Sequence, residues 1–518
     1  MSVLVSSDAS PSGDNNRLVT PQNQDLDATS DDQTNFSKHI TSVQLPVDAS
    51  ELKVNQMAKL WKVDLVQQNT FVGGEINLVT TVFNPPFAVD YSLLSKMKTF
   101  SFDTGWKELP GEWTEPAAAS FLNLVVSDIG RVTGQAFQRY WTLNQILPGS
   151  QKPDIVLLDI NHEEPVHWRN IRALTEVMRS KAEIDRVVYT FNDNTFTMLT
   201  TQFNRTFVPV ISIFDKYFRL AVTDRQGHLC SIVYNLSGPH ALHLVHLLAT
   251  LCFGSPGAIG YDPSVLTNSR DETTAIICDT VTYKVLHCIH AVQRLFGRAT
   301  HVFLVESNNQ QFILKDSWVE TSDPYSEIRH MKRIQGVQGV PVLEHGWNVK
   351  ILNEVLSTWL IRQGNYGSIL GSRVRRRLVT SSIGVPISQF KTKRELISAF
   401  RDITESAYTI LCITSKSITT DINSIAHYEI CNYRNTVHRD ISINNIMLFK
   451  QEDATTNLRR GLLIDFDNAA KITDSEEDSP SHYRTARILL SLYPLPWLFT
   501  ITLGNPSFHG IRYLTWTG

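Results

Sequence analysis

Two short acidic motifs near residue 450 constrain the fold of this chain more than any other feature of its sequence. The first, HRDISINN, occupies residues 438–445, and the second, IDFD, occupies residues 464–467. An apolar run typical of a β-strand, IMLF, follows the first motif, and another, GLL, precedes the second. A loop, a hairpin and a return strand would bring the acidic side chains of both motifs together. The alternative is two ordinary turns whose carboxylates are solvated.

The residue types in these motifs suit the transfer of a phosphoryl group. That reaction needs a clamp on the phosphates, one or two magnesium ions, and a carboxylate beside the attacking hydroxyl. Asp440 is the candidate carboxylate, and Asn445 and Asp465 offer the oxygen atoms that Mg²⁺ prefers. The sequence therefore predicts a magnesium site with Asn445 and Asp465 as metal ligands.

Several motifs, taken in order, resemble the fungal-type protein kinase family. HRDISINN is similar to the catalytic loop of protein kinases, and IDFD stands where they carry DFG. The upstream matches are KPDIVLLD, DRQG, GYDP, LFGRATHVF, ILKDSW and the helical SEIRHMKRI, so that the resemblance covers roughly residues 120–485. It implies an α+β, bilobal protein-kinase-like domain that uses ATP and Mg²⁺ to phosphorylate Ser/Thr hydroxyls of protein substrates.

The resemblance also implies roles for individual residues. Lys315 takes the position of the lysine that neutralises the α- and β-phosphates, and Glu327 that of its ion-pair partner. Asp440 would accept or orient the hydroxyl proton. Gly297 is the one glycine retained of the three expected in the phosphate-binding loop, so it is the candidate nucleotide contact there.

The chain also departs from the protein-kinase pattern, which keeps two alternatives open. Ser442 stands where Ser/Thr kinases have a lysine, and Asp467 replaces the glycine of DFG, although the fungal family commonly has serine at the first position and departs at the second in the same way. One alternative is a catalytically inactive pseudokinase or interaction module. The other is a small-molecule phosphotransferase of the aminoglycoside or choline type, against which Arg439 argues because those enzymes usually have glycine there.

Composition divides the chain into three regions. Residues 1–45 are rich in Ser, Asp, Asn, Gln and Thr, which predicts a disordered tail because so few apolar residues cannot offset the entropy of ordering. Residues 46–265 mix helical patterns, as at 121–137, with strand patterns, as at 230–236, and are interpreted as a family-specific N-terminal α/β domain. After the Gly/Pro break SPGAIGYDPS, residues 270–518 are predicted to form the kinase-like domain. Its predicted elements include a hairpin of strands 300–305 and 312–318, a helix at 326–335 and a strand at 375–383.

Two stretches of the kinase-like domain do not fit the expected pattern. The helix before HRD would run from DITE directly into AHYEICNYRN, and the Ser/Thr/Ile-rich residues 406–425 interrupt it, which is interpreted as a retained intron. Residues 486–518 lack the helices and anchor motif expected after IDFD and are interpreted as the product of a shifted reading frame. The sequence thus predicts an incomplete C-lobe.

Charge and cysteine content limit the partners and the compartment. A net charge of −3 provides no field to hold a polyanion, so nucleic acid is not expected as a partner. The six cysteines form no CxxC pair and no secretory signal is visible, which favours an intracellular protein, cytoplasmic or nuclear. Residues 242–253 are too short to span a membrane and residues 488–504 contain two prolines, so no membrane partner is expected.

The segment KPD…TEVM has the two acids of a metal-dependent nuclease motif but lacks its lysine. Asp154 and Glu176 take the acidic positions, and Met178 stands where the lysine would activate the hydrolytic water. The sequence therefore predicts a unit that is nuclease-like in fold at most and catalytically silent.

Overall fold

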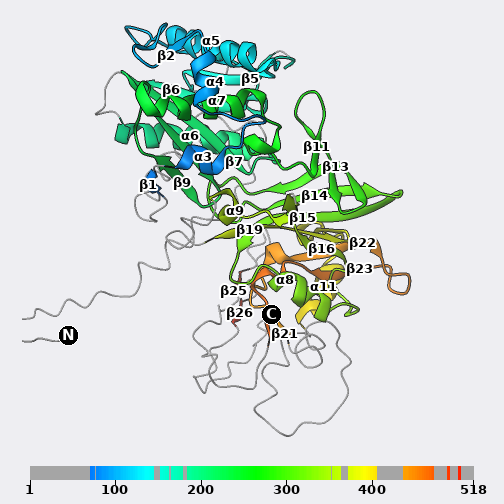
Figure 1. Ribbon diagram of the computed structural model, residues 1–518. Coiled ribbons are helices and arrows are strands. Elements are labelled where there is room, and N and C mark those ends of the chain that lie inside the picture. The colour runs from blue at the N-terminus through cyan, green and yellow to red at the C-terminus, as the bar shows by residue number, and fades with distance from the viewer. Residues whose placement is uncertain are drawn as a thin grey trace, which may run out of the picture. The chain divides into compact units, whose positions relative to one another are not determined.

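The computed structural model describes ten segments of the chain. They are residues 71–75, 77–144, 152–162, 165–178, 184–351, 353–362, 372–404, 436–471, 487–489 and 500–502. Residues 50–518 form one compact unit, in which the elements are arranged as Figure 1 shows. The predicted tail at 1–45 and the predicted intron at 406–425 lie outside the described residues. Of 486–518, only the paired strands β25 (Arg487–Leu489) and β26 (Thr500–Thr502) are described.

The first sheet has eight strands in the order β1-β9-β8-β7-β6-β5-β4, with β10 also paired to β8. The β6–β7 and β1–β9 pairs are parallel and the others are antiparallel. The strands are β1 (Phe71–Glu75), β4 (Arg139–Leu143), β5 (Ile155–Asp159), β6 (Ala173–Met178), β7 (Phe207–Phe214), β8 (Tyr217–Asp224), β9 (Gly227–Ser231) and β10 (Tyr234–Asn235).

Helices cover both faces of this sheet (Figure 1). Successive strand residues point to opposite faces, so Ile155 and Leu157 pack against one helical layer while Val156 and Leu158 pack against the other. The first layer is α3 (Leu78–Val82), α4 (Tyr91–Lys96), α5 (Glu115–Thr133) and α7 (Ala241–Phe253), and the second is α6 (Ile184–Thr201). A small hairpin of β2 (Phe100–Ser101) and β3 (Gly105–Trp106) adjoins the first layer.

Two predictions for this region differ in detail from the structure. The helix predicted at 121–137 begins earlier, after the N-cap Thr114, and ends at Thr133 because Gly134 adopts a left-handed conformation with φ 70°. The strand predicted at 230–236 is broken into β9 and β10. Cys230 pairs with Ala221 and Tyr234 with Phe218, so one extra residue lies between the two pairs, as in a β-bulge.

The second sheet has seven antiparallel strands in the order β11-β12-β13-β14-β15-β19-β16. Its predicted hairpin is confirmed: β14 and β15 are joined by Asn308 and Asn309, whose positive φ values of 51° and 61° suit a tight two-residue turn. The strands are β11 (Val265–Thr267), β12 (Thr273–Cys278), β13 (Val281–Ala291), β14 (His301–Ser307), β15 (Gln310–Glu320), β16 (Leu343–Asn348) and β19 (Arg373–Thr380).

The first three strands of this sheet were not predicted. β13 begins with an alternation of apolar and polar residues, VTYKV, but continues with LHCIH, which is exposed and lacks the alternation that marks a half-buried strand. Because β11 begins at Val265, the second sheet starts at the position where the N-terminal domain was expected to end.

A third group of elements packs under the second sheet around α8 (Ser326–Arg333). One apolar cluster joins α8, β16, α11 and a small sheet of order β20-β22-β23. The remaining elements are α9 (Thr358–Ile361), α11 (Lys393–Thr404), β17 (Lys350–Ile351), β18 (Glu354–Val355), β20 (Gly384–Pro386), β21 (Thr436–Val437), β22 (Ile446–Glu452), β23 (Arg459–Leu463), β24 (Ala470–Lys471) and the 3₁₀ turns η2 (Trp168–Asn170), η4 (Gly238–His240), η5 (Gly257–Ile259), η6 (Ile387–Gln389), η8 (Ile443–Asn445) and η9 (Phe466–Asn468).

Buried contacts connect the two large sheets. Trp318 and Leu356 belong to the same apolar cluster as the α5 and α7 layer. Arg362 donates to both carboxylate oxygens of Asp224, at 2.8 and 2.7 Å, and both side chains are almost completely buried. No helix among the described residues is long and apolar enough to cross a membrane.

Candidate active site

The site is centred on Lys315, which projects from the middle of β15. Its Nζ atom lies 2.9 Å from Oε1 of Glu327, the second residue of α8. Glu327 is only 3% exposed, so the charge of the lysine stabilises a carboxylate that has little access to water. The structure thus brings together the lysine and glutamate that the sequence pairs by resemblance.

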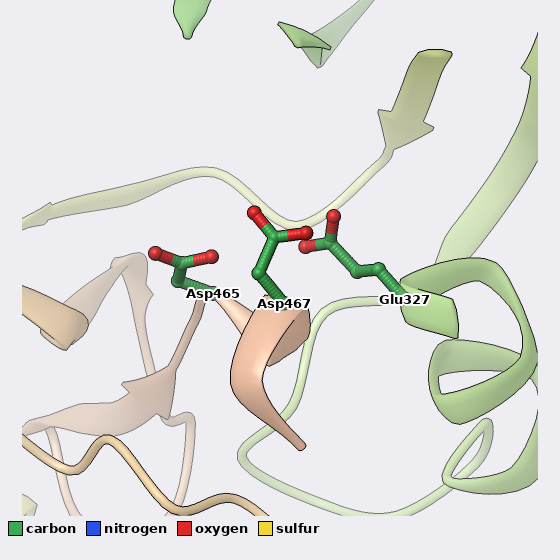
Figure 2. Close-up of side chains that lie close together, drawn as sticks. All are labelled: Glu327, Asp465 and Asp467. Atoms are coloured by element: carbon green, nitrogen blue, oxygen red, sulfur yellow. The ribbon is translucent and has the colours of Figure 1, made fainter. Parts of the chain in front are cut away.

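Two aspartates that follow β23 complete the cluster. Lys315 Nζ lies 2.7 Å from Asp465 Oδ1 and 2.8 Å from Asp467 Oδ2. Asp465 has a positive φ of 68°, and η9 begins immediately after it, so that the Asp467 side chain lies between those of Asp465 and Glu327 (Figure 2). One carboxylate oxygen from each of these three acids lies within 4.8 Å of those of the other two.

Two arginines that the sequence analysis did not assign also contact the cluster. Arg376 Nη2 lies 2.5 Å from Glu327 Oε2 and 2.5 Å from Asp467 Oδ1. Arg298 Nη1 lies 3.1 Å from Asp467 Oδ2. The signal in the sequence is the run of three arginines at 375–377 on a predicted strand. A strand buried on both faces can hold such a run only if carboxylates face it on each side.

The charges of the cluster shift the pKa values of its members in opposite directions. Burial lowers the pKa of Lys315, but Asp467, Glu327 and Asp465 outweigh burial and raise it above its ordinary value. For Asp467, burial alone would raise the pKa, yet Lys315, Arg376 and Arg298 together hold it well below its usual range. Burial and the neighbouring Asp467 raise the pKa of Glu327. Asp467 is therefore held in its charged form more firmly than Glu327.

The loop that carries HRD lies beside this cluster and is held by backbone contacts. His438 Nε2 lies 2.9 Å from the carbonyl oxygen of Ile464, and its ring packs edge-on against Phe466 with centroids 4.6 Å apart. Burial lowers the pKa of His438. The neutral imidazole therefore connects the HRD loop to the segment that precedes Asp465.

Asp440 and Asn445 lie next to each other in this loop. Asn445 Nδ2 donates to the carbonyl oxygen of Asp440 at 2.8 Å, and Asn468 Nδ2 donates to Asp440 Oδ2 at 3.1 Å. Asn445 is thus bonded to the catalytic-loop backbone here, while the acids that surround Asp465 are Asp467 and Glu327. The role of Asn445 as a metal ligand stays a prediction, and Asp467 is an acidic neighbour that the sequence analysis treated only as a departure from DFG.

The segment between β13 and β14 holds Gly297, which has a φ of 95°. Its backbone N–H donates to the carbonyl oxygen of Arg225, at 2.9 Å, in the turn between β8 and β9. The buried Arg225 guanidinium in turn donates to the carbonyl oxygens of Arg294 and Leu295 at 3.0 and 3.3 Å. The segment at the phosphate-loop position is therefore held by the first sheet, through the arginine of the DRQG motif, to which the sequence analysis assigned no role.

The site pairs a strand lysine with a glutamate on the next helix and with an aspartate after a later strand. In a fold of helices and sheets, this arrangement is that of a protein-kinase-like α+β protein. Residues 152–369 and 362–489 match the model of the family described as fungal protein kinase. The match covers more than half of the chain, and the chain belongs to that family. This membership supports a kinase-like function, and members of a kinase family generally use ATP and a divalent metal.

Two further comparisons add little to the family match. No curated protein matches the chain. Among solved structures, a crystal structure of the BubR1 kinase domain is 14% identical with a TM-score of 0.24, over 38% of this chain and 50% of that one. The chain thus spans half the length of that structure, and a TM-score this low carries no argument about the fold.

Proposed function

We propose that this protein is an ATP-dependent protein kinase that phosphorylates Ser/Thr hydroxyls of protein substrates. The observation that carries the proposal is the contact of Lys315 Nζ with Glu327 at 2.9 Å and with Asp465 at 2.7 Å. These three residues come from β15, α8 and the turn after β23, which are distant in the sequence. Kinases need a lysine–glutamate pair and a metal-binding aspartate to be in place together.

The donor set of the cluster fits a magnesium ion. Mg²⁺ prefers carboxylate oxygens and is commonly held by one or two of them together with phosphates and water. Asp465 is the most exposed acid of the cluster, with 37% of its side chain accessible, whereas Asp467 is 5% exposed. We assign Asp465 as the main metal ligand, with Asn445 as the second. When bound, the metal supplies positive charge beside the transferred phosphoryl group.

The protein's own residues have separable roles in this proposal. Lys315 neutralises the α- and β-phosphates, and Glu327 holds the lysine in place. Asp440 accepts or orients the proton of the attacking hydroxyl, with its carboxylate positioned by Asn468 at 3.1 Å. Gly297 allows the loop backbone to approach the phosphates, because a side chain at a φ of 95° would be strained.

The test combines nucleotide binding with phosphate transfer by the full-length chain. ATP·Mg²⁺ at about 100 times its Kd should stabilise the fold by about 2.7 kcal/mol, which thermal unfolding measures. Asp465→Ala should lower transfer of labelled γ-phosphate to a protein mixture by at least about 100-fold. Glu306→Gln, which removes an acid from β14 outside the cluster, should leave transfer unchanged.

Each outcome distinguishes the proposal from its alternatives. Wild-type transfer by Asp465→Ala would sink the assignment of the site. Absence of any stabilisation by ATP·Mg²⁺ would favour a non-catalytic module. Phosphorylation of amino-sugars or choline, with none of proteins, would favour a small-molecule phosphotransferase.

A further inference from the structure

A second pair of carboxylates lies in the first sheet, far along the chain from the kinase-like cluster. Ile155 on β5 pairs with Thr175 on β6, so one step further along the same register Asp154 lies opposite Glu176. Val177 N–H donates to Asp154 Oδ2 at 2.8 Å, and the backbone N–H of Asp154 donates to the Glu176 carboxyl group. The two acids are therefore neighbours across adjacent strands.

Two more polar side chains reach the same place. Ser212 on β7 is the register partner of Glu176 in the parallel β6–β7 pair, so its side chain lies beside that of Glu176 on the same face. Asn194 on α6, the helix that covers this face, donates through Nδ2 to Glu176 Oε1 at 3.0 Å. We refer to Asp154, Glu176, Ser212 and Asn194 as the β5–β6–β7 polar cluster.

The oxygen atoms of this cluster have too few partners. Ser212 is 2% exposed and Asn194 is 1% exposed, yet among the described residues Ser212 Oγ and Asn194 Oδ1 have no hydrogen-bond partner. A buried polar atom without a partner costs free energy and calls for an explanation, of which an ion is one. Here both unpartnered atoms are oxygens, and both lie next to Glu176.

In the part of the chain that the structure describes, no positive charge pairs with either acid. Neither Asp154 nor Glu176 has an ion pair with a described residue, and Glu115 at the start of α5 adds a further negative charge at longer range. Burial, and next the charge of Asp154, raise the pKa of Glu176 to about 8. The cluster therefore holds a buried acid, Glu176, and a half-buried one, Asp154, which repel each other whenever both are ionised.

We propose that the β5–β6–β7 polar cluster binds a divalent cation, Mg²⁺ or Mn²⁺, through carboxylate oxygens of Asp154 and Glu176. These ions prefer hard oxygen ligands, and a cation would both cancel the repulsion and give the Ser212 and Asn194 oxygens a partner, directly or through water. Met178 lies two residues after Glu176, where it provides no charge. The site is one for binding, and it is separate from the kinase-like cluster.

The test measures Mn²⁺ binding to the full-length chain, without nucleotide, by electron paramagnetic resonance of free Mn²⁺. The Asp465→Asn variant serves as the background, so that the kinase-like cluster does not contribute. This background should bind one Mn²⁺, and adding either Glu176→Gln or Asp154→Asn should abolish that binding. Adding Asp103→Asn, which removes an exposed acid from the β2–β3 hairpin, should leave the binding intact.

Asn194→Ala tests the same site without removing a carboxylate. Loss of a side chain that orients a metal ligand typically weakens metal affinity by about 10- to 100-fold. The same loss of affinity is expected here. Because Asn194 carries no charge, a change in net charge cannot account for this result.

Thermal unfolding provides a second readout that a folding defect cannot imitate. In a chelator, Glu176→Gln removes a repelling charge and should melt no lower than its background, whereas in Mn²⁺ only the background should gain stability. The proposal is overturned if the background binds no Mn²⁺, or if Glu176→Gln and Asp154→Asn retain its Mn²⁺ stoichiometry and affinity.

Discussion

The kinase-like cluster and the β5–β6–β7 polar cluster both bury acids, but they differ in the source of the opposing charge. Glu327, Asp465 and Asp467 face Lys315 and Arg376, with contacts between 2.5 and 2.9 Å. Asp154 and Glu176 face no cation from the described residues. Cations of the protein thus neutralise the first cluster, whereas the second has no such cation among the described residues.

Because of this difference, the two clusters should respond differently when a charge is removed or added. Breaking a buried ion pair leaves an uncompensated charge, so the kinase-like cluster depends on each of its cations. The acids of the other cluster can escape the same penalty only by protonation or by binding a cation. Four predictions test this contrast, in order of decreasing expected effect.

Lys315→Met should have the largest effect, because it removes the cation shared by all three acids. Phosphate transfer should fall by at least about 100-fold, and unfolding free energy by about 3 to 5 kcal/mol. Transfer assays and urea unfolding measure these losses. Lys284→Met, on the exposed face of β13, is the control and should change neither quantity. Equal losses in both variants would show that the effect does not come from the cation shared by the three acids.

Arg376→Met should make the kinase-like cluster resemble the uncompensated one. The side chain is 1% exposed and bonds both Glu327 and Asp467, so its loss should cost about 3 kcal/mol in urea unfolding. Arg373→Met is a matched control on the same strand, since the Arg373 side chain forms polar contacts only with the backbone carbonyl of Trp318, at 3.3 Å, and the exposed Glu320, at 3.8 Å, among the described residues. A cost for Arg376→Met no greater than that of the control would show that the buried contacts contribute little.

His228 extends the contrast to a basic group in the first sheet. Burial and, next, Arg362 lower the pKa of His228 to about 3 from its ordinary 6.5. The folded state therefore binds fewer protons than the unfolded state between these values, so His228 contributes stability that is present above about pH 6.5 and lost as pH falls towards 3. Between pH 6.5 and pH 4 the loss should be on the order of 3 kcal/mol.

The measurement for His228 is urea unfolding between pH 7 and pH 4. His228→Gln keeps a polar side chain beside Thr223, whose Oγ1 lies 2.7 Å from His228 Nδ1, but it cannot take up a proton. The variant should lose less stability on acidification than the wild type. Parallel pH curves would mean that His228 has no part in acid sensitivity.

Gly297→Ala should have the smallest effect. A Cβ atom there meets open space, so the cost comes from the positive φ of 95° and should be about 1 kcal/mol. Gly336, at φ 87° and also in open space, is a matched control outside the loop. Both variants should lose similar stability in thermal unfolding, while only Gly297→Ala should raise the KM for ATP; an equal KM in both would separate Gly297 from nucleotide binding.

Local patterns in the sequence were enough to predict several elements and part of the site. The alternation and turn residues around 300–318 predicted the β14–β15 hairpin, and the periodicity at 326–335 predicted α8. These two elements place Lys315 and Glu327, whose pairing the resemblance to kinases implied. Such features depend on residues close together in the chain, and short-range patterns therefore report them.

Only the tertiary structure decided which groups complete the clusters. Lys315 and Asp467 are 152 positions apart, and Arg376 and Asp467 are 91 positions apart, so no local spacing relates them. The sequence likewise showed that Met178 replaces a lysine, but not that Asp154 lies opposite Glu176. Residue types determined by themselves which chemistry the chain can perform. Strand register and long-range packing decided which charges meet, because the pairing free energy depends on distance and burial rather than on position in the chain.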